Sequence, residues 1–587
     1  MKRLKFAGLP LLVAVALLLS SCTGSGHPAA QTPQPAEREN APHGMEEEIV
    51  TLKVLIIEQN VKWNEFPGHA VAEEIERKLG VRIEFVTVDE DGFNMRLVSG
   101  DLPDIVRSEP SKYGKQLIEG GLIIPMDSML EPYGQDIAAN IPSVVEYSRS
   151  KWSAGRGQLF FLPPQVQPEA SPEYPPLTIG PTIRWDYYKE IGAPEFHTPD
   201  ELLDVLELIV KKFPETPEGL PTFGVSMWQD WGLWPYVVPF AWYTMQAGGN
   251  SELMVRTLGE PQYENILTEE DSAYWVAMDF YSKAQRRGLL DPDALTMKQK
   301  DYMAKASAGQ LAIGPAIWAM GDFNSKHAKE GKGYIVLPAG KRAWSGGATP
   351  YGWSGKSYAI TRGSKHPEKA MQLLNYLYSY EGVRTLYNGI ERVHWEFRDG
   401  VPKIKDETFQ LKHEGGTDWD AAGIAMELNM IGLGGSVLDP ATGTPLDLFQ
   451  TPEALVKGAS ELEKDFSRHY GGLHPGDVLR KFIEEGKLVD SNTVWGSGPA
   501  DQTADEGEAK PENNAGGTDE IPASMLKIEA QLKELASGYA IKLIYAKDDK
   551  EFHRLKQEAL RRFKEAGADE FTAFYTGSGN GNRAELP

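Results

Sequence analysis

The chain has 587 residues, a formal net charge of −24 and one cysteine. This length is more than one hydrophobic core usually organises, so we expect two α/β lobes. The sequence has no basic stripe or arginine-rich segment to neutralise phosphates, which argues against a nucleic-acid partner. A single cysteine excludes an internal disulfide.

The N-terminus has the pattern of an export signal. Basic residues precede an apolar run over 6–19, which is too short to span a bilayer. The run ends in Leu-Ser-Ser-Cys, which resembles a bacterial lipobox, so residues 1–21 are predicted to be a lipoprotein signal peptide and Cys22 the lipidated residue. Two or three acyl chains would hold the protein at a membrane surface. The alternative is a plain signal peptide with a stray cysteine.

The next segment, residues 22–48, is rich in Ser, Gly, Pro, Gln and Glu and predicts a flexible tether. The pattern then alternates. Residues 51–57 predict a strand, 70–79 a helix that stops at Gly80, and 81–88 a second strand. A strand, a helix and a parallel strand make a βαβ unit.

A dense aromatic stretch runs from Trp228 to Tyr243. Gly232, Pro235 and Pro239 interrupt it, so it cannot be one continuous helix. Aromatic rings present flat apolar faces on which sugar rings can stack, and Gln229 and Asp230 beside them could bind hydroxyl groups. The alternative is that these rings fill an ordinary core.

Further helices carry local signals. Thr198, Pro199 and Glu201 predict a capping box before an apolar helical face. A capped helix is predicted within 268–295, ending at Gly288. Near the C-terminus we expect a disordered insertion at 495–520, and then, in order, a helix over 524–536, a strand over 541–546, a helix over 549–566 and a flexible tail over 576–587.

Four segments together resemble the extracellular solute-binding proteins of ABC importers, family 1, and specifically a long lipoprotein subgroup associated with oligosaccharide uptake in Gram-positive bacteria. They are SGDLPDIV (99–106), GLIIPMDSMLEPYGQDIAANIP (121–142), PTIRWDYYKEIGAPEFHTPDEL (181–202) and residues 366–397. The last segment departs from the family pattern at Arg392, where relatives usually have Gly. The resemblance extends over about 50–575.

The resemblance implies an α/β, two-lobed fold of the periplasmic-binding-protein type II (Venus-flytrap) class, with a ligand cleft between the lobes. Lobe I is expected over 49–163, with return segments near 325–400, and lobe II over 164–325. Residues 158–163 are expected to be the strand that leads to lobe II. Residues 400–494 are expected to continue lobe II, mainly as helices, and 521–575 to form the C-terminal helices and strand.

The candidate ligand contacts are aromatic residues and two charged residues at expected strand ends. They are Trp63, Glu109, Arg184, Trp185, Trp228, Trp231, Trp242, Trp318 and Trp353. Some relatives carry a calcium loop of the form D-x-N-x-N-G after the 198–213 helix. Residues 213–225 offer only Glu215 and Glu218 there, so we expect no metal, and we expect no cofactor.

The sequence contains no phosphate-binding glycine motif, no GxSxG and no HExxH. No motif therefore demands catalysis. The family resemblance implies a monomeric binding protein, and not an enzyme, that captures an oligosaccharide outside the cell for an ABC permease. Two alternatives stay open: a lipoprotein that senses sugars or peptides for a signalling partner, and a surface carbohydrate-active enzyme with two cleft carboxylates.

Overall fold

The computed structural model describes residues 49–57, 68–169, 176–248, 251–258, 260, 262–343, 349–426, 430–490 and 522–576. The chain divides into two units, residues 1–48 and 49–587. Cys22, the signal peptide, the tether, Trp63, the 495–520 insertion and the tail from 577 on lie outside the described residues.

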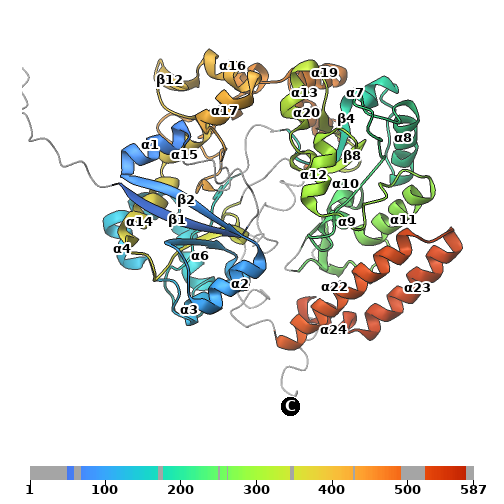
Figure 1. Ribbon diagram of the computed structural model, residues 1–587, viewed down its shortest axis with the longest axis horizontal. Helices are drawn as coiled ribbons and strands as arrows, with labels where there is room; N and C mark the ends of the chain where they lie inside the picture. Colours follow the sequence, from blue (N-terminus) through green and yellow to red (C-terminus); the bar gives the residue numbers. More distant parts are fainter. Residues whose placement is uncertain are drawn as a thin grey trace, which may run out of the picture. The chain divides into compact units, whose positions relative to one another are not determined.

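The first sheet has the order β11-β3-β1-β2. Figure 1 shows its strands β1 and β2 side by side. Its strands are β1 Val50–Ile57, β2 Val81–Val88, β3 Ile105–Ser108 and β11 Ser357–Ile360. β1 pairs in parallel with β2 and β3, and α1 (Ala70–Leu79) connects β1 to β2, which confirms the predicted βαβ unit. Gly80 ends α1 with a φ of 63°, a conformation that favours glycine. β11 returns antiparallel to β3, as expected for a segment that re-enters the first lobe.

Both faces of this sheet are buried, as is usual for parallel strands. Leu52, Val54 and Ile56 pack in one hydrophobic cluster, whereas Leu55 packs in another on the opposite face. The helices of this lobe are α1, α2 Glu90–Ser99, α3 Pro110–Glu119, α4 Asp127–Tyr133, α5 Gln135–Asn140, α6 Pro142–Lys151, α14 Pro367–Leu377 and α15 Tyr380–Asn388. The segment 158–163 is not a strand, because only an isolated bridge from Leu162 to Tyr358 forms there.

The second core surrounds an antiparallel sheet of order β8-β4-β9. Its strands are β4 Ile179–Arg184, β8 Ile313–Ala316 and β9 Tyr334–Val336. The main helices are α7 Trp185–Glu190, α8 Pro199–Lys212, α11 Ala273–Arg286, α12 Gln299–Ser307 and α13 Phe323–His327. The predicted capping box forms at α8, and α11 ends just before Gly288. Small strands β5 Gln246–Gly248, β6 Met254–Thr257 and β7 Glu264–Asn265 form a further sheet.

The C-terminal helices α22 (Ala523–Ile544), α23 (Asp549–Glu565) and α24 (Ala568–Thr576) belong to the second core, and α22 packs along α11 (Figure 1). The predicted strand over 541–546 is wrong, because these residues form and follow the last turns of α22. Tyr539, Ala540, Leu543 and Ile544 are buried at helical spacing, so packing overrides the local strand pattern.

Region 400–494 is divided between the two cores, in contrast to the expected assignment to lobe II. Ala422, Ile431 and Leu446 pack in the first core, whereas Leu462 and Phe466 pack in the second. Its elements include β13 Val401–Ile404, which pairs with β12 Trp395–Arg398, and the helices α16 Asp406–Glu414, α17 Gly416–Ala422, α18 Pro452–Lys457, α19 Glu461–Tyr470 and α20 Pro475–Glu484. β14 Val489–Asp490 pairs with β10 Arg342–Ala343.

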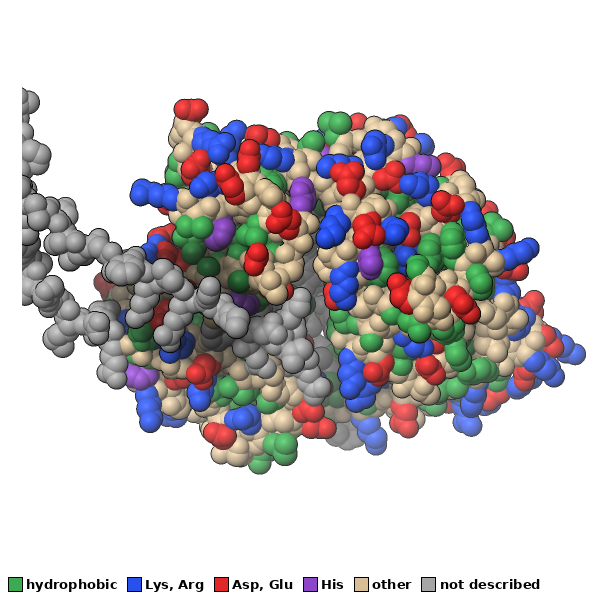
Figure 2. Space-filling model, turned by 45° about the horizontal axis from the view of Figure 1, so that its top comes forward, with side chains coloured by type: hydrophobic (Ala, Val, Ile, Leu, Met, Phe, Trp, Pro, Cys, Tyr) green, Lys and Arg blue, Asp and Glu red, His purple; other side chains and the backbone are tan. Residues whose placement is uncertain are grey.

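Charges of both signs are interspersed over the face shown in Figure 2, so the net charge of −24 forms no single acidic patch there. Among the residues that the structure describes, no helix is long and apolar enough to cross a membrane.

Candidate ligand-binding site

The aromatic stretch folds as short helical pieces, which confirms that it is not one helix. α9 (Trp234–Val237), the 3-10 turn η2 (Val238–Phe240) and α10 (Ala241–Thr244) follow one another. Gly232 precedes them with a φ of 55°. Pro235 lies in the first turn of α9, where a helix does not need the N–H that proline lacks. The proline therefore fits this short helix without disrupting it.

Four indole rings meet in what we call the tryptophan cluster: Trp228, Trp231, Trp234 and Trp318. Trp318 arrives from a distant segment, the 3-10 turn η3 (Ile317–Met320) after β8. The ring centroids of Trp231 and Trp318 are 5.5 Å apart with 28° between their planes. Trp228 lies 5.6 Å from Trp234 and 4.8 Å from Tyr302. The cluster therefore joins the aromatic stretch to the end of the second sheet.

Burial separates these rings into two kinds. Trp228 is fully buried, whereas Trp231 is 41% exposed and Trp318 is 38% exposed. Trp234 is half-buried between them. Large exposed aromatic rings in contact with one another form an apolar surface that water solvates poorly, so this pair is the part of the cluster available to a ligand. The buried Trp228 ring contacts both exposed rings, Trp231 and Trp318, and so holds them in place.

The two polar neighbours of Trp231 differ in what they can still bind. Gln229 is committed to the protein, because its side chain donates to the Ala294 carbonyl and accepts from the Tyr236 hydroxyl. The Asp230 side chain is exposed and accepts the Gln299 N–H at 2.9 Å through one oxygen. Its second oxygen can accept a hydrogen bond from a hydroxyl group.

Two predicted contact residues, Trp185 and Trp242, lie in the second core instead. Trp185 is fully buried and its indole N–H donates to Asp465. Trp242 is 5% exposed and packs edge-on against Phe196. A buried ring has no free face for a sugar, so we place neither in the site.

Arg184 is also structural. Its guanidinium group is nearly fully buried, pairs with Asp186 at 2.8 Å and donates to the Gly309 carbonyl. The carbon of the guanidinium group also lies 4.1 Å from the ring centroid of Phe323. These interactions satisfy the charge within the protein.

In the first lobe, Glu109 and Trp353 flank the paired ends of β3 and β11, where Ser108 lies opposite Ser357. Glu109 is the N-cap residue just before α3, and its carboxylate accepts from the Ser111 hydroxyl at 2.6 Å. Trp353 is 45% exposed.

The Lys356 ammonium lies 4.8 Å from the Trp353 ring centroid. Burial lowers the pKa of Lys356 to about 8. Sequence reasoning missed this lysine, since nothing in its sequence context distinguishes it from a surface residue. It also left Trp234 out of the contacts, although Trp234 belongs to the same aromatic stretch.

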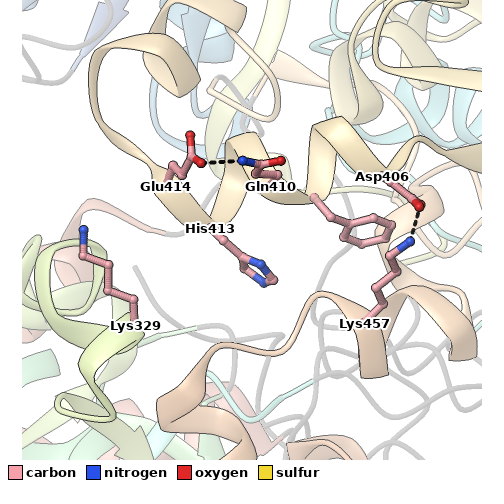
Figure 3. A pocket seen from close by; sticks show the side chains of 7 residues that line it. Lys329, Asp406, Gln410, His413, Glu414 and Lys457 are labelled. Carbon is pink, nitrogen blue, oxygen red and sulfur yellow. Dashed lines mark hydrogen bonds and ion pairs between the residues drawn. The ribbon is translucent and has the colours of Figure 1, made fainter.

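A hollow lined mainly by polar side chains lies elsewhere. Figure 3 shows its lining, a depression of about 470 Å³ between α16, Lys329 and Lys457. Gln410 donates to Glu414, Lys457 pairs with Asp406, and the His413 ring contacts the Gly458 carbonyl. These groups satisfy one another, and no exposed tryptophan lines the hollow. Within the described part of the chain, no group of three or more His, Cys, Asp or Glu could hold a metal ion.

A family model for bacterial extracellular solute-binding proteins matches residues 68–384. The chain belongs to this family. The residues matched include β2, β3 and β11 of the first sheet and all three strands of the second. No curated protein matches this solute-binding protein in sequence.

Solved structures confirm the predicted two-lobed, periplasmic-binding-protein-like fold. The solute-binding protein resembles the alginate-binding protein AlgQ2 solved without calcium (TM-score 0.56, 17% identity, 90% of this chain and 98% of that one). It also resembles the substrate-binding protein FusA of S. pneumoniae in complex with kestose (TM-score 0.56, 16% identity, 91% of this chain and 99% of that one). A third is a solute-binding protein of *Bifidobacterium longum infantis* associated with an HMO-binding ABC transporter (0.51, 14%, 90% and 98%). At these identities the likeness establishes the fold alone.

Proposed function

We propose that this solute-binding protein captures an oligosaccharide outside the cell and delivers it to the membrane permease of an ABC importer. The observation that carries the proposal is the exposed pair of Trp231 and Trp318, held on the buried ring of Trp228. A rigid aromatic surface with an adjacent carboxylate oxygen suits a sugar, which has an apolar ring face and hydroxyl groups at its edge.

The energetics are adequate for a transport protein. Stacking on one ring contributes on the order of 1 kcal/mol beyond burial, by analogy with aromatic pairs. Micromolar affinity requires roughly 8 kcal/mol in total. The stacking of two or three rings, the burial of their apolar faces, and hydrogen bonds that the Asp230 and Glu109 carboxylates accept from hydroxyl groups together account for an affinity of this order.

Delivery requires that the ligand change the protein. In a two-lobed protein, a ligand favours the closed state only if it binds that state more tightly than the open one. We place Trp231, Trp318 and Asp230 on the second lobe, and Trp353 and Glu109 on the first, as the groups that a sugar contacts together in the closed state. The permease then recognises the closed form.

Membrane attachment is the second part of the proposal. Cys22 follows a lipobox-like sequence, and acylation there would keep the protein near its permease on the outer face of the cell membrane. Cells grown with radiolabelled palmitate should yield labelled wild-type protein and unlabelled Cys22→Ser protein. Equal labelling of both, or no labelling of wild type, would contradict lipidation.

Trp231→Ala tests the site. We expect sugar binding to weaken about tenfold or more, with the thermal unfolding midpoint nearly unchanged because the ring is exposed. Phe397→Ala, which removes a 48% exposed ring on β12, is the matched control and should bind as wild type does. Unchanged affinity in Trp231→Ala would remove this residue from the site.

A further inference from the structure

A charged network joins the C-terminal helix α22 to the segment that precedes β6. The Lys533 ammonium lies 3.2 Å from Glu252 and 3.0 Å from Glu529. The Ser251 hydroxyl donates to the same Glu529 carboxylate at 2.7 Å and also accepts the Leu253 N–H. One lysine of α22 therefore holds the carboxylate of Glu252 in place.

That carboxylate lies directly against the loop that carries Trp231. A Cβ atom added to Gly232, the next residue, would lie 3.2 Å from one Glu252 oxygen and 3.5 Å from the other. Gly232 has a φ of 55°, which other residues rarely adopt. The backbone after Trp231 thus takes a conformation that glycine permits, with the Glu252 carboxylate packed on its open side.

The helix that supplies Lys533 is fixed in the second core. Leu532 and Ala536 on either side of it are fully buried, and the buried Tyr274 hydroxyl of α11 donates to the Ala536 carbonyl at 2.9 Å. Burial acts to lower the pKa of Lys533, but Glu252 and Glu529 outweigh it and the pKa is raised. The lysine is therefore charged at neutral pH on a rigid support.

We propose that Lys533 is a positioning residue for the sugar-stacking ring of Trp231, acting through Glu252. The inference rests on the proposed function, since it assigns to the C-terminal helix a part in the same site. Without the ammonium group, Glu252 and Glu529 repel one another, the Glu252 carboxylate leaves Gly232, and the loop that presents Trp231 loses its support.

The direct test is Lys533→Met in the full chain. We expect sugar affinity to fall by about threefold to tenfold, as for coupled neighbouring sites, and Lys533→Arg to retain most of it. The control is Lys542→Met, which removes an exposed lysine of the same helix whose ammonium lies 4.6 Å from the Tyr539 ring centroid. This control should bind as wild type does.

A double-mutant cycle separates positioning from general loss of structure. In a Trp231→Ala background, Lys533→Met should have no further effect on affinity, because the ring that it positions is absent. An equal loss in both backgrounds, or no loss in the single variant, would overturn the proposal.

A readout without sugar keeps this test apart from the proposed function. Quenching of tryptophan fluorescence by iodide is measured for each protein and for the same protein with Trp231→Ala, and the difference gives the contribution of Trp231. Lys533→Met should change this contribution, whereas Lys542→Met should not. If no oligosaccharide binds but this quenching changes, the proposed function fails and the link from α22 to the loop stands. Unchanged quenching overturns the link itself.

Discussion

The indole rings of Trp231 and Trp318 lie 5.5 Å apart with only 28° between their planes, although they come from segments on different sides of α11 and α12 in the chain. Both rings are more than one-third exposed, and both contact the fully buried Trp228. A solvent-exposed pair on a buried support is a costly arrangement for a surface that binds nothing, because the exposed apolar area gains no burial energy.

Substitution of the buried and of the exposed tryptophans should lower the free energy of unfolding by very different amounts. Trp228→Ala should lower the free energy of unfolding by about 3–5 kcal/mol, the usual cost of removing a large buried ring. Trp318→Ala, which removes a 38% exposed ring, should cost much less. Urea unfolding followed by circular dichroism measures both, and similar losses would show that the exposed ring is also part of the core.

The partly buried Lys356 should make the folded protein more stable as the pH rises from about 8 to 10.5. Its folded-state pKa is about 8, below the ordinary 10.5, because burial disfavours the charged form. Between these values the unfolded chain binds more protons than the folded chain, so stability rises as pH rises from about 8 to 10.5. Since the side chain is partly exposed, we expect a gain on the order of 1–2 kcal/mol.

The measurement is the difference in unfolding free energy between wild type and Lys356→Met across this pH range. Taking the difference cancels the titration of tyrosines common to both proteins. Lys300→Met, on an exposed position of α12, serves as the control and should follow wild type. A wild-type curve parallel to that of Lys356→Met would show that the lysine has an ordinary pKa.

Replacing Arg392 by glycine should stabilise the protein. It has a φ of 66°, in the left-handed region, and its side chain is 89% exposed. Its N–H donates to the Trp395 carbonyl at 2.6 Å, so the backbone is held there despite the Cβ atom. Arg392→Gly should relieve this strain and raise the free energy of unfolding by about 0.5–1 kcal/mol, once the greater entropy of an unfolded glycine is counted.

The control for this prediction is Arg398→Gly, because Arg398 lies in β12, where glycine weakens a strand. It should lower the thermal unfolding midpoint. If Arg392→Gly lowers the midpoint as well, the side chain contributes more than its exposed position indicates.

Local sequence signals predicted most of the fold. The βαβ unit over 50–88 follows from apolar spacing and Gly80, and α8 follows from Thr198 and Glu201. The strand predicted over 541–546 failed because its apolar residues also fit a helical face, and only packing against α11 decides between the two.

The site was harder to predict than the fold, because exposure is a property of packing between distant segments. Trp228 and Trp231 cannot be told apart from the sequence. In the structure, residues of η3 and α12 cover Trp228, whereas Trp231 stays 41% exposed. Arg184 was predicted at a ligand site from its place at a strand end, whereas Asp186 and Gly309 already satisfy its charge. No pattern within a short window distinguishes these outcomes.

The most direct test of the central claim is calorimetric titration of the mature protein with a panel of oligosaccharides, repeated on a Trp231→Ala/Trp318→Ala variant. We expect at least one oligosaccharide to bind wild type with about micromolar affinity, and the double variant to fold normally but lose this binding. Binding of no member of the panel, or equal affinity in the double variant, would contradict it.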